Sequence, residues 1–277
     1  MTSKPQKSRS GVARKALFIF LLLIAACSPR SYVVNERHNA AKNLNLRGNE
    51  SYFRGDYAGA ARLYDRALAL AMEIDDRAGM AESLNNIGQL YTEAGDLSPA
   101  GEKFLEAGRL NSEINNKKGL AINLNNSGNV LRLRRNYEAA AAEFKKALEL
   151  AQEAGDKNGC AVVTNNMGLL ALDLGENTRA RKHFEEALDA AKGLKHHRLA
   201  AACMQNLGAL AESEGKIDDA IASFSESVAE DRLVEYSPGM AKGLESLGRL
   251  FDKKENLSLS QDYYKRAQFI RERLKFK

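Results

Sequence analysis

The sequence predicts an all-α protein built as a solenoid of six helical hairpins. Runs rich in Ala, Leu, Glu, Lys and Asn, with only four prolines in 277 residues, favour helix over strand. Residues of one type return every 40 positions through most of the chain, and such a period is the sequence signature of a solenoid. Turn pairs such as Gly55-Asp56 and Gly95-Asp96 divide each repeat unit into two helices.

The period is clearest at a glycine and at an aromatic residue. The glycine series is Gly48, Gly88, Gly128, Gly168, Gly208 and Gly248, and the aromatic series is Tyr64, Phe104, Phe144, Phe184, Phe224 and Tyr264. Small residues stand four positions before and three positions after each aromatic residue, on the same helical face as the ring. We expect the glycine to let the two helices of a hairpin approach closely, and the ring to fill the gap against the next hairpin.

The order Leu, Gly, turn, Ala, aromatic, Ala resembles the tetratricopeptide repeat (TPR), whose usual period is about 34 residues. The fragment Leu84-Asn85-Asn86-Ile87-Gly88 is similar to the long-repeat branch typified by kinesin light chain. HEAT repeats also have a period near 40, but they would not supply this order. The resemblance covers residues 37–277, and it implies a right-handed superhelical solenoid that binds a protein or peptide partner in a concave groove.

Residues 1–26 form a segment of a different kind. Five basic residues and no acidic residue accompany an apolar run from Ala16 to Ala26. This run is shorter than the roughly 20 residues of a membrane-spanning helix, and it fits the roughly 7 to 15 residues of a signal-peptide core. We expect residues 1–26 to be a cleaved signal peptide. The alternative is an uncleaved signal anchor.

The apolar run ends in Ile24-Ala25-Ala26-Cys27, which resembles the lipobox of bacterial lipoproteins. The resemblance implies that Cys27 is lipidated, that residues 27–36 are the lipidated cysteine and a short linker, and that the membrane is one partner of the protein. Ser28 stands where an aspartate is the usual inner-membrane retention signal in that family. We therefore expect an outer-membrane lipoprotein that faces the periplasm.

The net charge and the cysteines limit the remaining possibilities for the function and for a disulfide. The formal net charge is +5, and the leader carries five basic residues, so the mature chain is near neutral and lacks the basic footprint of a nucleic-acid binder. Cys160 and Cys203 would lie in an oxidising compartment, where a disulfide is allowed. The alternative is that both are small buried hydrophobic residues.

No catalytic or metal site is expected, and no cofactor. A catalytic cluster would stand out from the repeat, and none does. The pair His196-His197 lacks the spacing of a helical zinc site, so we expect both residues to be solvated in a connection between repeats.

Asparagine is the informative polar residue, because it is a mediocre residue for a helix interior and nevertheless recurs. The candidate groove residues are Asn45, Asn49, Asn86, Gln89, Asn126, Asn129, Asn166 and Asn206, with Asn85, Asn125 and Asn165 beside three of them. By the resemblance, this phase of the first helix lines the concave groove, where amides would bind a peptide backbone. The alternative is an amide ladder that joins one repeat to the next. Both hypotheses stay open at this point.

Two details describe the expected groove. The basic residues of the carboxylate clamp found in some TPR domains are missing, because the corresponding positions hold Asn and Ile. Glu82, Glu93 and Arg132 would give the groove mixed charge.

The expected function is a membrane-anchored TPR scaffold that helps to assemble or localise an envelope complex. The alternative is a regulatory TPR module that senses a peptide, and an enzyme with an unrecognised site is a residual third class. Fold-level analogy supports these classes without separating them. The oligomeric state and the partner stay unassigned.

Overall fold

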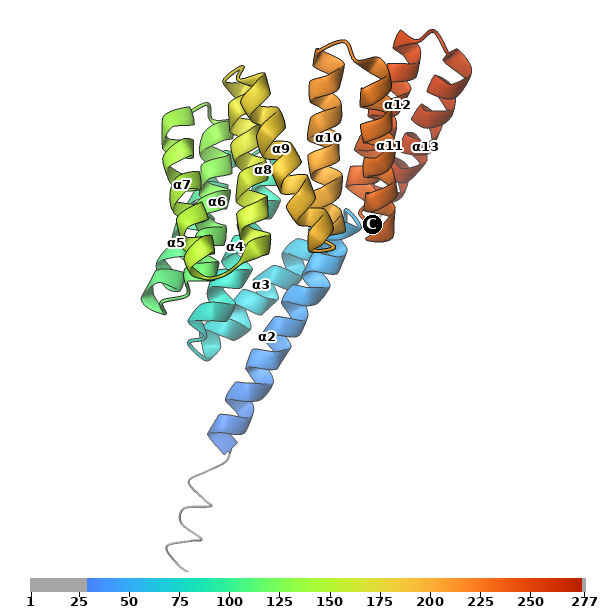
Figure 1. Cartoon of the computed structure of the whole chain (residues 1–277). Helices are drawn as coiled ribbons and strands as arrows, with labels where there is room; N and C mark the ends of the chain where they lie inside the picture. Colours follow the sequence, from blue (N-terminus) through green and yellow to red (C-terminus); the bar gives the residue numbers. More distant parts are fainter. Residues whose placement is uncertain (1–28, 276–277) are drawn as a thin grey trace, which may run out of the picture.

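The computed structural model describes residues 29–275, which form twelve α-helices (Figure 1). They are α2 (Pro29–Phe53), α3 (Tyr57–Glu73), α4 (Arg77–Ala94), α5 (Leu97–Glu113), α6 (Lys117–Leu133), α7 (Tyr137–Glu153), α8 (Lys157–Asp173), α9 (Asn177–Gly193), α10 (His197–Ser213), α11 (Ile217–Leu233), α12 (Ser237–Lys253) and α13 (Leu257–Lys275). Each even-numbered helix packs on the next odd-numbered helix, so the predicted solenoid of six helical hairpins is confirmed. The signal peptide and Cys27 lie outside the described residues.

Eleven turns of one kind join these helices, and they recur twice in each period of the sequence. One residue in each turn has a positive φ, and it is Gly55, Asp75, Gly95, Asn115, Arg135, Gly155, Gly175, Lys195, Gly215, Glu235 or Glu255. The backbone N–H of the next residue donates to the carbonyl five positions back, as from Asp56 to Ser51 at 2.9 Å. This bond closes a Schellman-type C-cap. Six of the eleven positions lack glycine, so the turn geometry is imposed on residues that rarely adopt it.

Several helices begin with a polar side chain that caps the first turn. The side chains of Asp56, Asp76 and Asn116 each accept a hydrogen bond from the N–H of the glycine three residues later, at 2.8 to 3.1 Å. His196 does the same for Leu199 at 3.2 Å. His196 is therefore an N-cap, and His197 contacts Glu230 at 2.7 Å, so neither is the freely solvated residue that the sequence suggested.

The recurring geometry inside each hairpin comes from the glycine and the aromatic ring. A Cβ atom placed on Gly48 would lie 2.4 Å from the Tyr64 ring, and one on Gly168 would lie 2.6 Å from Phe184. The ring therefore packs on the glycine of its own hairpin. It also reaches the next hairpin, as Phe184 does in a cluster with Leu207, which agrees with the expected gap filling. Phe144 and Phe184 are completely buried.

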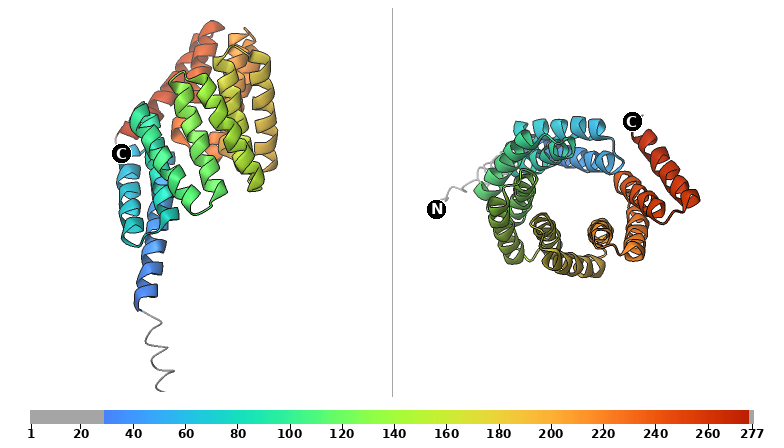
Figure 2. Two further views of the ribbon diagram at one scale, coloured as in Figure 1. Left: turned by 90° about the vertical axis from the view of Figure 1, so that its left-hand side faces the viewer. Right: turned by 90° about the horizontal axis from the view of Figure 1, so that it is seen from above.

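The hairpins stack into a superhelix that completes about one turn, so that the molecule is close to a ring when it is viewed along its axis (Figure 2). Even-numbered helices of consecutive hairpins contact one another and form the inner layer, while the odd-numbered helices form the outer layer. The last hairpin, α12 and α13, lies beside the first. The inner layer is where side chains of neighbouring repeats meet.

Two further expectations concern the N-terminal segment and the cysteines. Residues 29–36, expected as part of a linker, are helical and continue into α2. A helix rises about 1.5 Å per residue and an extended chain about 3.3 Å or more, so this segment spans less than half of its extended length. Among the described helices, none combines the length and the apolar character that crossing a membrane would require. Cys160 and Cys203 are free thiols, as in the alternative without a disulfide, but only Cys203 is fully buried and Cys160 is half-buried.

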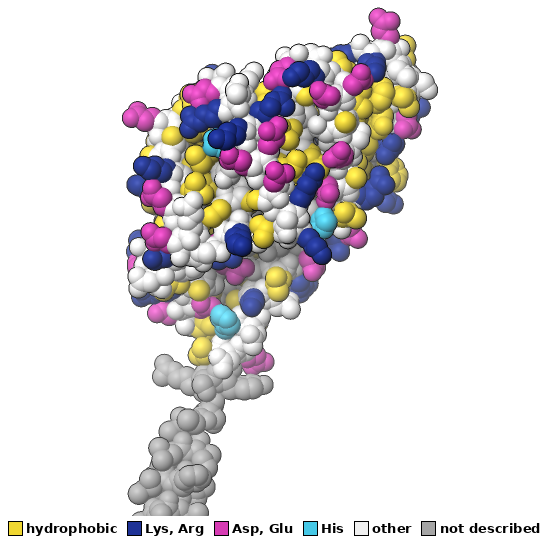
Figure 3. Space-filling model, viewed as in Figure 1, with side chains coloured by type: hydrophobic (Ala, Val, Ile, Leu, Met, Phe, Trp, Pro, Cys, Tyr) yellow, Lys and Arg dark blue, Asp and Glu magenta, His cyan; other side chains and the backbone are white. Residues whose placement is uncertain are grey.

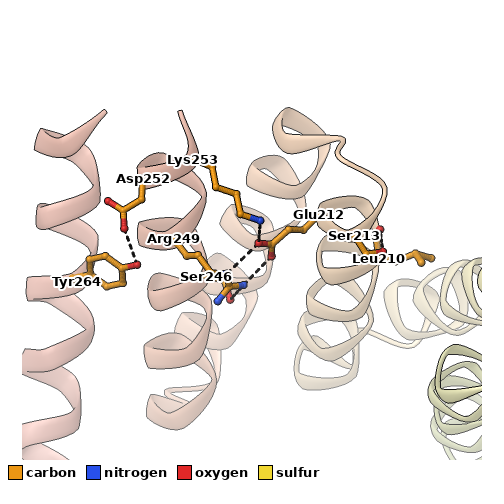
Figure 4. A network of polar contacts seen from close by, with 8 residues as sticks. All are labelled: Leu210, Glu212, Ser213, Ser246, Arg249, Asp252, Lys253 and Tyr264. Atoms are coloured by element: carbon orange, nitrogen blue, oxygen red, sulfur yellow. Dashed lines mark hydrogen bonds and ion pairs between the residues drawn. The ribbon is translucent and has the colours of Figure 1, made fainter. Parts of the chain in front are cut away.

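Ion pairs join neighbouring inner helices near their C-terminal ends. Glu212 of α10 accepts hydrogen bonds from Arg249 of α12 at 2.8 Å and from Lys253 at 2.7 Å (Figure 4). These two cationic donors hold the pKa of Glu212 at about 2. The equivalent position two repeats earlier holds Arg132, which pairs with Asp173 at 2.6 Å. At this height of the stack, neighbouring inner helices are thus joined by ion pairs, and the acidic partner lies on the earlier helix in one pair and on the later helix in the other.

Asp231 is a buried carboxylate near the end of α11. Its side chain accepts a hydrogen bond from Gln205 at 3.4 Å, and no cation pairs with it among the described residues. Burial raises its pKa to about 7, against the opposing charge of Arg198. Three repeats earlier the same position holds Asn111, which makes two amide hydrogen bonds at 2.7 Å. The fold therefore accepts a neutral amide at this position.

We predict that Asp231→Asn stabilises the protein above neutral pH. The carboxyl is protonated in the folded state up to about pH 7 but ionises near pH 4 in the unfolded state. Folded-state stability is therefore lost as the pH rises from about 4 to 7, and an asparagine escapes that loss. Each pKa unit corresponds to about 1.4 kcal/mol, which bounds the gain at about 4 kcal/mol. Thermal midpoints at pH 4, 6 and 8 measure the effect.

The matched control is Asp189→Asn, on the exposed face of α9. We expect this control to follow the wild-type midpoint at each pH. A variant Asp231→Asn that gains nothing at pH 8, or gains equally at pH 4, would contradict the assignment.

Candidate functional site

Six asparagine side chains of α4, α6, α8 and α10 form one connected hydrogen-bond network. Between repeats, the Nδ2 of Asn206 donates to Oδ1 of Asn165 at 3.0 Å. In the same way Asn166 donates to Asn125, and Asn126 to Asn85, each at 2.8 Å. Within a helix, Asn165 donates to Asn166 at 3.5 Å and Asn125 to Asn126 at 3.2 Å. The amides thus form a zigzag from α10 to α4, which is the ladder that the sequence left as one alternative.

A second branch of amides enters the same network from α5 and the turn that follows it. Asn116 donates to Asn111 at 2.7 Å, and Asn111 donates to Asn123 at 2.7 Å. Asn123 in turn donates to Oδ1 of Asn85 at 3.1 Å. Both branches are therefore directed toward one oxygen atom. Cooperative polarisation strengthens each successive bond in such a chain.

Asn85 is the point where the two branches converge. Its Oδ1 accepts from both Asn123 and Asn126, while its Nδ2 donates to no other described residue. The side chain is about nine-tenths buried, and the residue lies at the wall of a cavity. Unlike the Nδ2 of Asn86, this donor is not fully enclosed, so it can form a hydrogen bond with water or with an acceptor from outside the chain.

The cavity beside Asn85 has a volume of about 440 Å³ and lies between the first three repeats. Its charged lining residues are His38, Lys42, Asp76, Glu82 and Lys118. His38 is paired with Asp76 at 2.6 Å, and Lys118 is paired with Asp156 at 3.4 Å. Lys42 and Glu82 make no ion pair within the described part of the chain. Burial raises the pKa of Glu82, and the nearby Lys42 opposes that shift.

Small and apolar residues complete the cavity wall. Ala78, Ala81 and Ile122 lie beside the polar groups, and the Ile122 side chain is partly exposed. A hollow of this size with a few polar groups on an apolar wall has the general features of a ligand site. The groups that the wall offers to a ligand are the amide donor of Asn85, the carboxylate of Glu82 and the ammonium group of Lys42, with a small apolar surface between them.

The predicted groove residues divide into three groups: members of the ladder, buried residues of the first two repeats, and residues about one turn further along the inner helices. Asn126, Asn166 and Asn206 are partly exposed members of the ladder. Asn45 is buried and exchanges hydrogen bonds with Ser83 of the next repeat at 3.0 and 3.2 Å. The Nδ2 of Asn86 is buried without a hydrogen-bond partner among the described residues.

The remaining predicted residues lie about one turn further along the inner helices. Asn49 accepts from the hydroxyl of Tyr64 at 2.8 Å, and Asn129 accepts from Arg132 at 3.1 and 3.2 Å. Gln89 makes no side-chain hydrogen bond within the described residues. Binding of a partner by any of these eight residues stays a prediction.

The mixed charge expected for the groove is present, but two of its three residues are engaged between repeats. Glu93 accepts from the Tyr52 hydroxyl at 2.9 Å, and Arg132 pairs with Asp173. On the face shown in Figure 3, basic and acidic side chains alternate without a large area of one sign. Glu82 is the member of the three that faces the cavity.

Sequence reasoning missed the residues that close the network. Asn85 was treated as a neighbour of the groove series, although it is the residue that meets the cavity. Asn111 and Asp231 were not singled out, although in the first five repeats the other residues of their series are Ala71, Ala151 and Ala191. The signal that could have identified these two residues was a polar side chain at a position where other repeats have a small buried residue. In the described part of the chain, no three His, Cys, Asp or Glu side chains lie together as a metal site would need.

We predict that replacing Asn126 and Asn166 together by alanine lowers the thermal midpoint. The double variant loses four amide hydrogen bonds, each worth about 1 kcal/mol, while alanine returns at most about 0.7 kcal/mol of helix propensity per site. Circular dichroism measures the midpoint. The control is Asn158→Ala with Asn177→Ala, at two exposed positions. A midpoint equal to wild type would show that the ladder bonds add no stability.

Comparisons with solved structures support the fold. The chain is similar to a Rap protein solved with the competence and sporulation factor, with a TM-score of 0.63, 16% identity, and coverage of 85% of this chain and 76% of that one. It is also similar to BtubC (BKLC) from P. vanneervenii, with a TM-score of 0.57, 20% identity, and coverage of 78% and 89%. A Rap conjugation regulator of plasmid pLS20, solved with the Phr* peptide, has a TM-score of 0.54, 19% identity, and coverage of 84% and 73%.

Comparisons of the sequence identify the family. No curated protein gives a significant match. The family model described as the tetratricopeptide repeat matches residues 40–107, 119–193 and 159–232, which together make up more than half of the chain. With six hairpins that each place a glycine against an aromatic ring, the chain belongs to the tetratricopeptide repeat family.

Proposed function

We propose that this protein is a lipid-anchored TPR scaffold that binds an extended segment of a partner protein in the cavity between its first three repeats. The observation that carries the proposal is the unpaired Nδ2 of Asn85 at the cavity wall. A backbone carbonyl of the partner is the acceptor that fits this donor. TPR scaffolds offer such inner surfaces to other proteins, and assembly or localisation of an envelope complex is the role that the expected membrane anchor favours.

The charges of the cavity wall limit which partner segments would fit it. Lys42 and Glu82 occupy the same position in consecutive repeats and are unpaired among the described residues. A segment with one charge of each sign, or a polar segment with small apolar side chains, would complement them without leaving a buried charge. A strongly acidic or strongly basic segment would leave one of the two uncompensated.

A peptide-sensing regulatory module is the second candidate. Two of the similar structures are Rap proteins, one solved with the competence and sporulation factor and the other with the Phr* peptide. Identities of 16 and 19% support a shared fold, and the role comes to this chain only as part of this second proposal. A scaffold retains a folded partner protein, whereas a sensor binds a short free peptide.

We predict that Asn85→Asp abolishes partner capture and leaves the fold intact. Aspartate keeps an oxygen that accepts from Asn123 and Asn126, but it replaces the Nδ2 donor with a second acceptor. The measurement is affinity capture of the partner from membranes solubilised in mild detergent, with quantitative mass spectrometry of the captured proteins. The matched control is Asn177→Asp on the exposed outer helix α9, which adds the same charge.

The expected result is a protein that wild type and Asn177→Asp capture equally and that Asn85→Asp loses. Equal capture by all three would remove Asn85 from the site. Cross-linking then identifies the region of the partner that lies in the cavity. A synthetic peptide of that region separates the two candidates, because a sensor binds it as tightly as it binds the whole partner.

We further propose that Cys27 is the point of membrane attachment. The support is the lipobox resemblance after a basic leader, and a protein with several acyl chains would be held firmly, since a single chain anchors only marginally. Cys27→Ser is expected to abolish incorporation of labelled palmitate and to release the protein from the membrane fraction. Wild-type partitioning of the variant would instead identify residues 16–26 as a retained anchor.

A further inference from the structure

The first hairpin contacts the fifth and sixth hairpins through a cluster of rings around one arginine. The guanidinium carbon of Arg198, at the start of α10, lies 4.7 Å from the ring centroid of Phe53, 5.0 Å from that of Tyr236 and 5.7 Å from that of Tyr52. Phe53 and Tyr236 pack edge to face with centroids 6.4 Å apart. We name these four residues the closure cluster.

A second contact joins the same parts of the molecule. A Cβ atom on Gly55, in the turn between α2 and α3, would lie 2.5 Å from the Cδ2 atom of Leu274 in α13. The end of the last helix therefore lies directly on the first turn, as the ring-like view indicates (Figure 2). Both contacts connect residues that are more than a hundred positions apart in the sequence.

The three rings of the closure cluster depart from the period of the repeat, and Arg198 lies at a position where the repeat has no fixed residue type. The positions equivalent to Arg198 hold His38, Ala78, Lys118, Asn158 and Pro238. One to five periods after Tyr52 or Phe53, no position holds an aromatic residue. Tyr236 stands where Asp76, Asn116 and His196 cap their helices, and it makes no capping bond to α12. The turn before α12 therefore carries a ring that packs on the first hairpin in place of a capping side chain.

We propose that the closure cluster is an intramolecular latch that holds the superhelix in its closed form and can open reversibly. In a solenoid, each repeat contacts only its neighbours, so the repeats alone do not require the ends to meet. Within the described residues, no hydrogen bond or ion pair joins the first hairpin to the last two. Packing of one cation against three rings, together with the contact of Leu274 on Gly55, holds them together, and such packing is weak enough to be reversible.

The latch also acts on the helices that form the cavity. Tyr52 belongs to α2 and donates to Glu93 of α4, and both helices contribute residues to the cavity wall. Opening the ring would free one end of α2 from α10 and α12 while the contact with α4 remains. The curvature of the first repeats is therefore set in part by Arg198. This inference does not depend on the proposed partner.

Small-angle neutron scattering of the full chain tests the latch, in a detergent whose scattering is matched by the solvent. The variants are Arg198→Ala, which removes the cation, and Tyr236→Asn, which removes a ring and restores the residue type that caps α6 at Asn116. The control is Arg179→Ala, because Arg179 bonds only Glu176 beside it. We expect a larger radius of gyration in both variants and no change in the control, with helix content unchanged.

The scattering result decides the proposal in each case. A wild-type radius in either variant overturns the latch, since each removes a necessary part of it. A larger radius accompanied by loss of helix content also overturns it, because the expansion would then report unfolding of hairpins. Tyr236→Asn is the safeguard, since the asparagine supplies a cap and should not weaken α12.

Discussion

The contact between a glycine of each inner helix and the aromatic ring of its outer helix is the constraint on which the rest of the structure depends. In all six hairpins the ring occupies the space that a side chain at the glycine would need. The spacing of the two layers is therefore the same throughout the stack, and the inner helices follow a shorter arc than the outer ones. That arc brings inner helices of consecutive repeats into contact and lets amides 41 residues apart form hydrogen bonds. The ladder is a consequence of this curvature.

The amide network explains how a helix can hold so many asparagines. Asparagine is a poor interior residue because its side chain competes for backbone groups, and an amide already bonded to another amide cannot compete. Each member both donates and accepts, except where the network ends. One end is the Nδ2 of Asn85 at the cavity, and Asn86 is the position where the pattern fails, since its Nδ2 is buried without a partner among the described residues. If the proposed binding at Asn85 holds, structure and binding use different atoms of the same side chains, and the two hypotheses for this series need not exclude each other.

The period alone was enough to predict the twelve helices, even at turns without glycine such as Arg135, because a helix ends twice in each period at a constant interval. The role of His196 as a cap could also have been read from its position, which Asp76 and Asn116 occupy in earlier repeats. The different roles of Asn85 and Asn86 could not be read from the sequence. Adjacent helix positions are about 100° apart, and which of them meets the neighbouring helix depends on the curvature of the stack.

Contacts between the ends of the chain lie further beyond sequence reasoning. The place of Arg198 relative to Phe53 is the sum of the rotations between four pairs of hairpins, so a small change in each rotation would separate them. What the sequence does contain is the set of departures from the period: the rings of Tyr52, Phe53 and Tyr236 and the carboxylate of Asp231 stand where the repeat has other residue types. Two of these choices weaken the repeat that carries them, through a missing cap at α12 and a buried carboxylate in α11. In a solenoid, each hairpin is stabilised only by its neighbours. A contact between the first hairpin and the fifth therefore gives each end of the stack an additional partner. The missing cap and the buried carboxylate lie in the hairpins that make this contact.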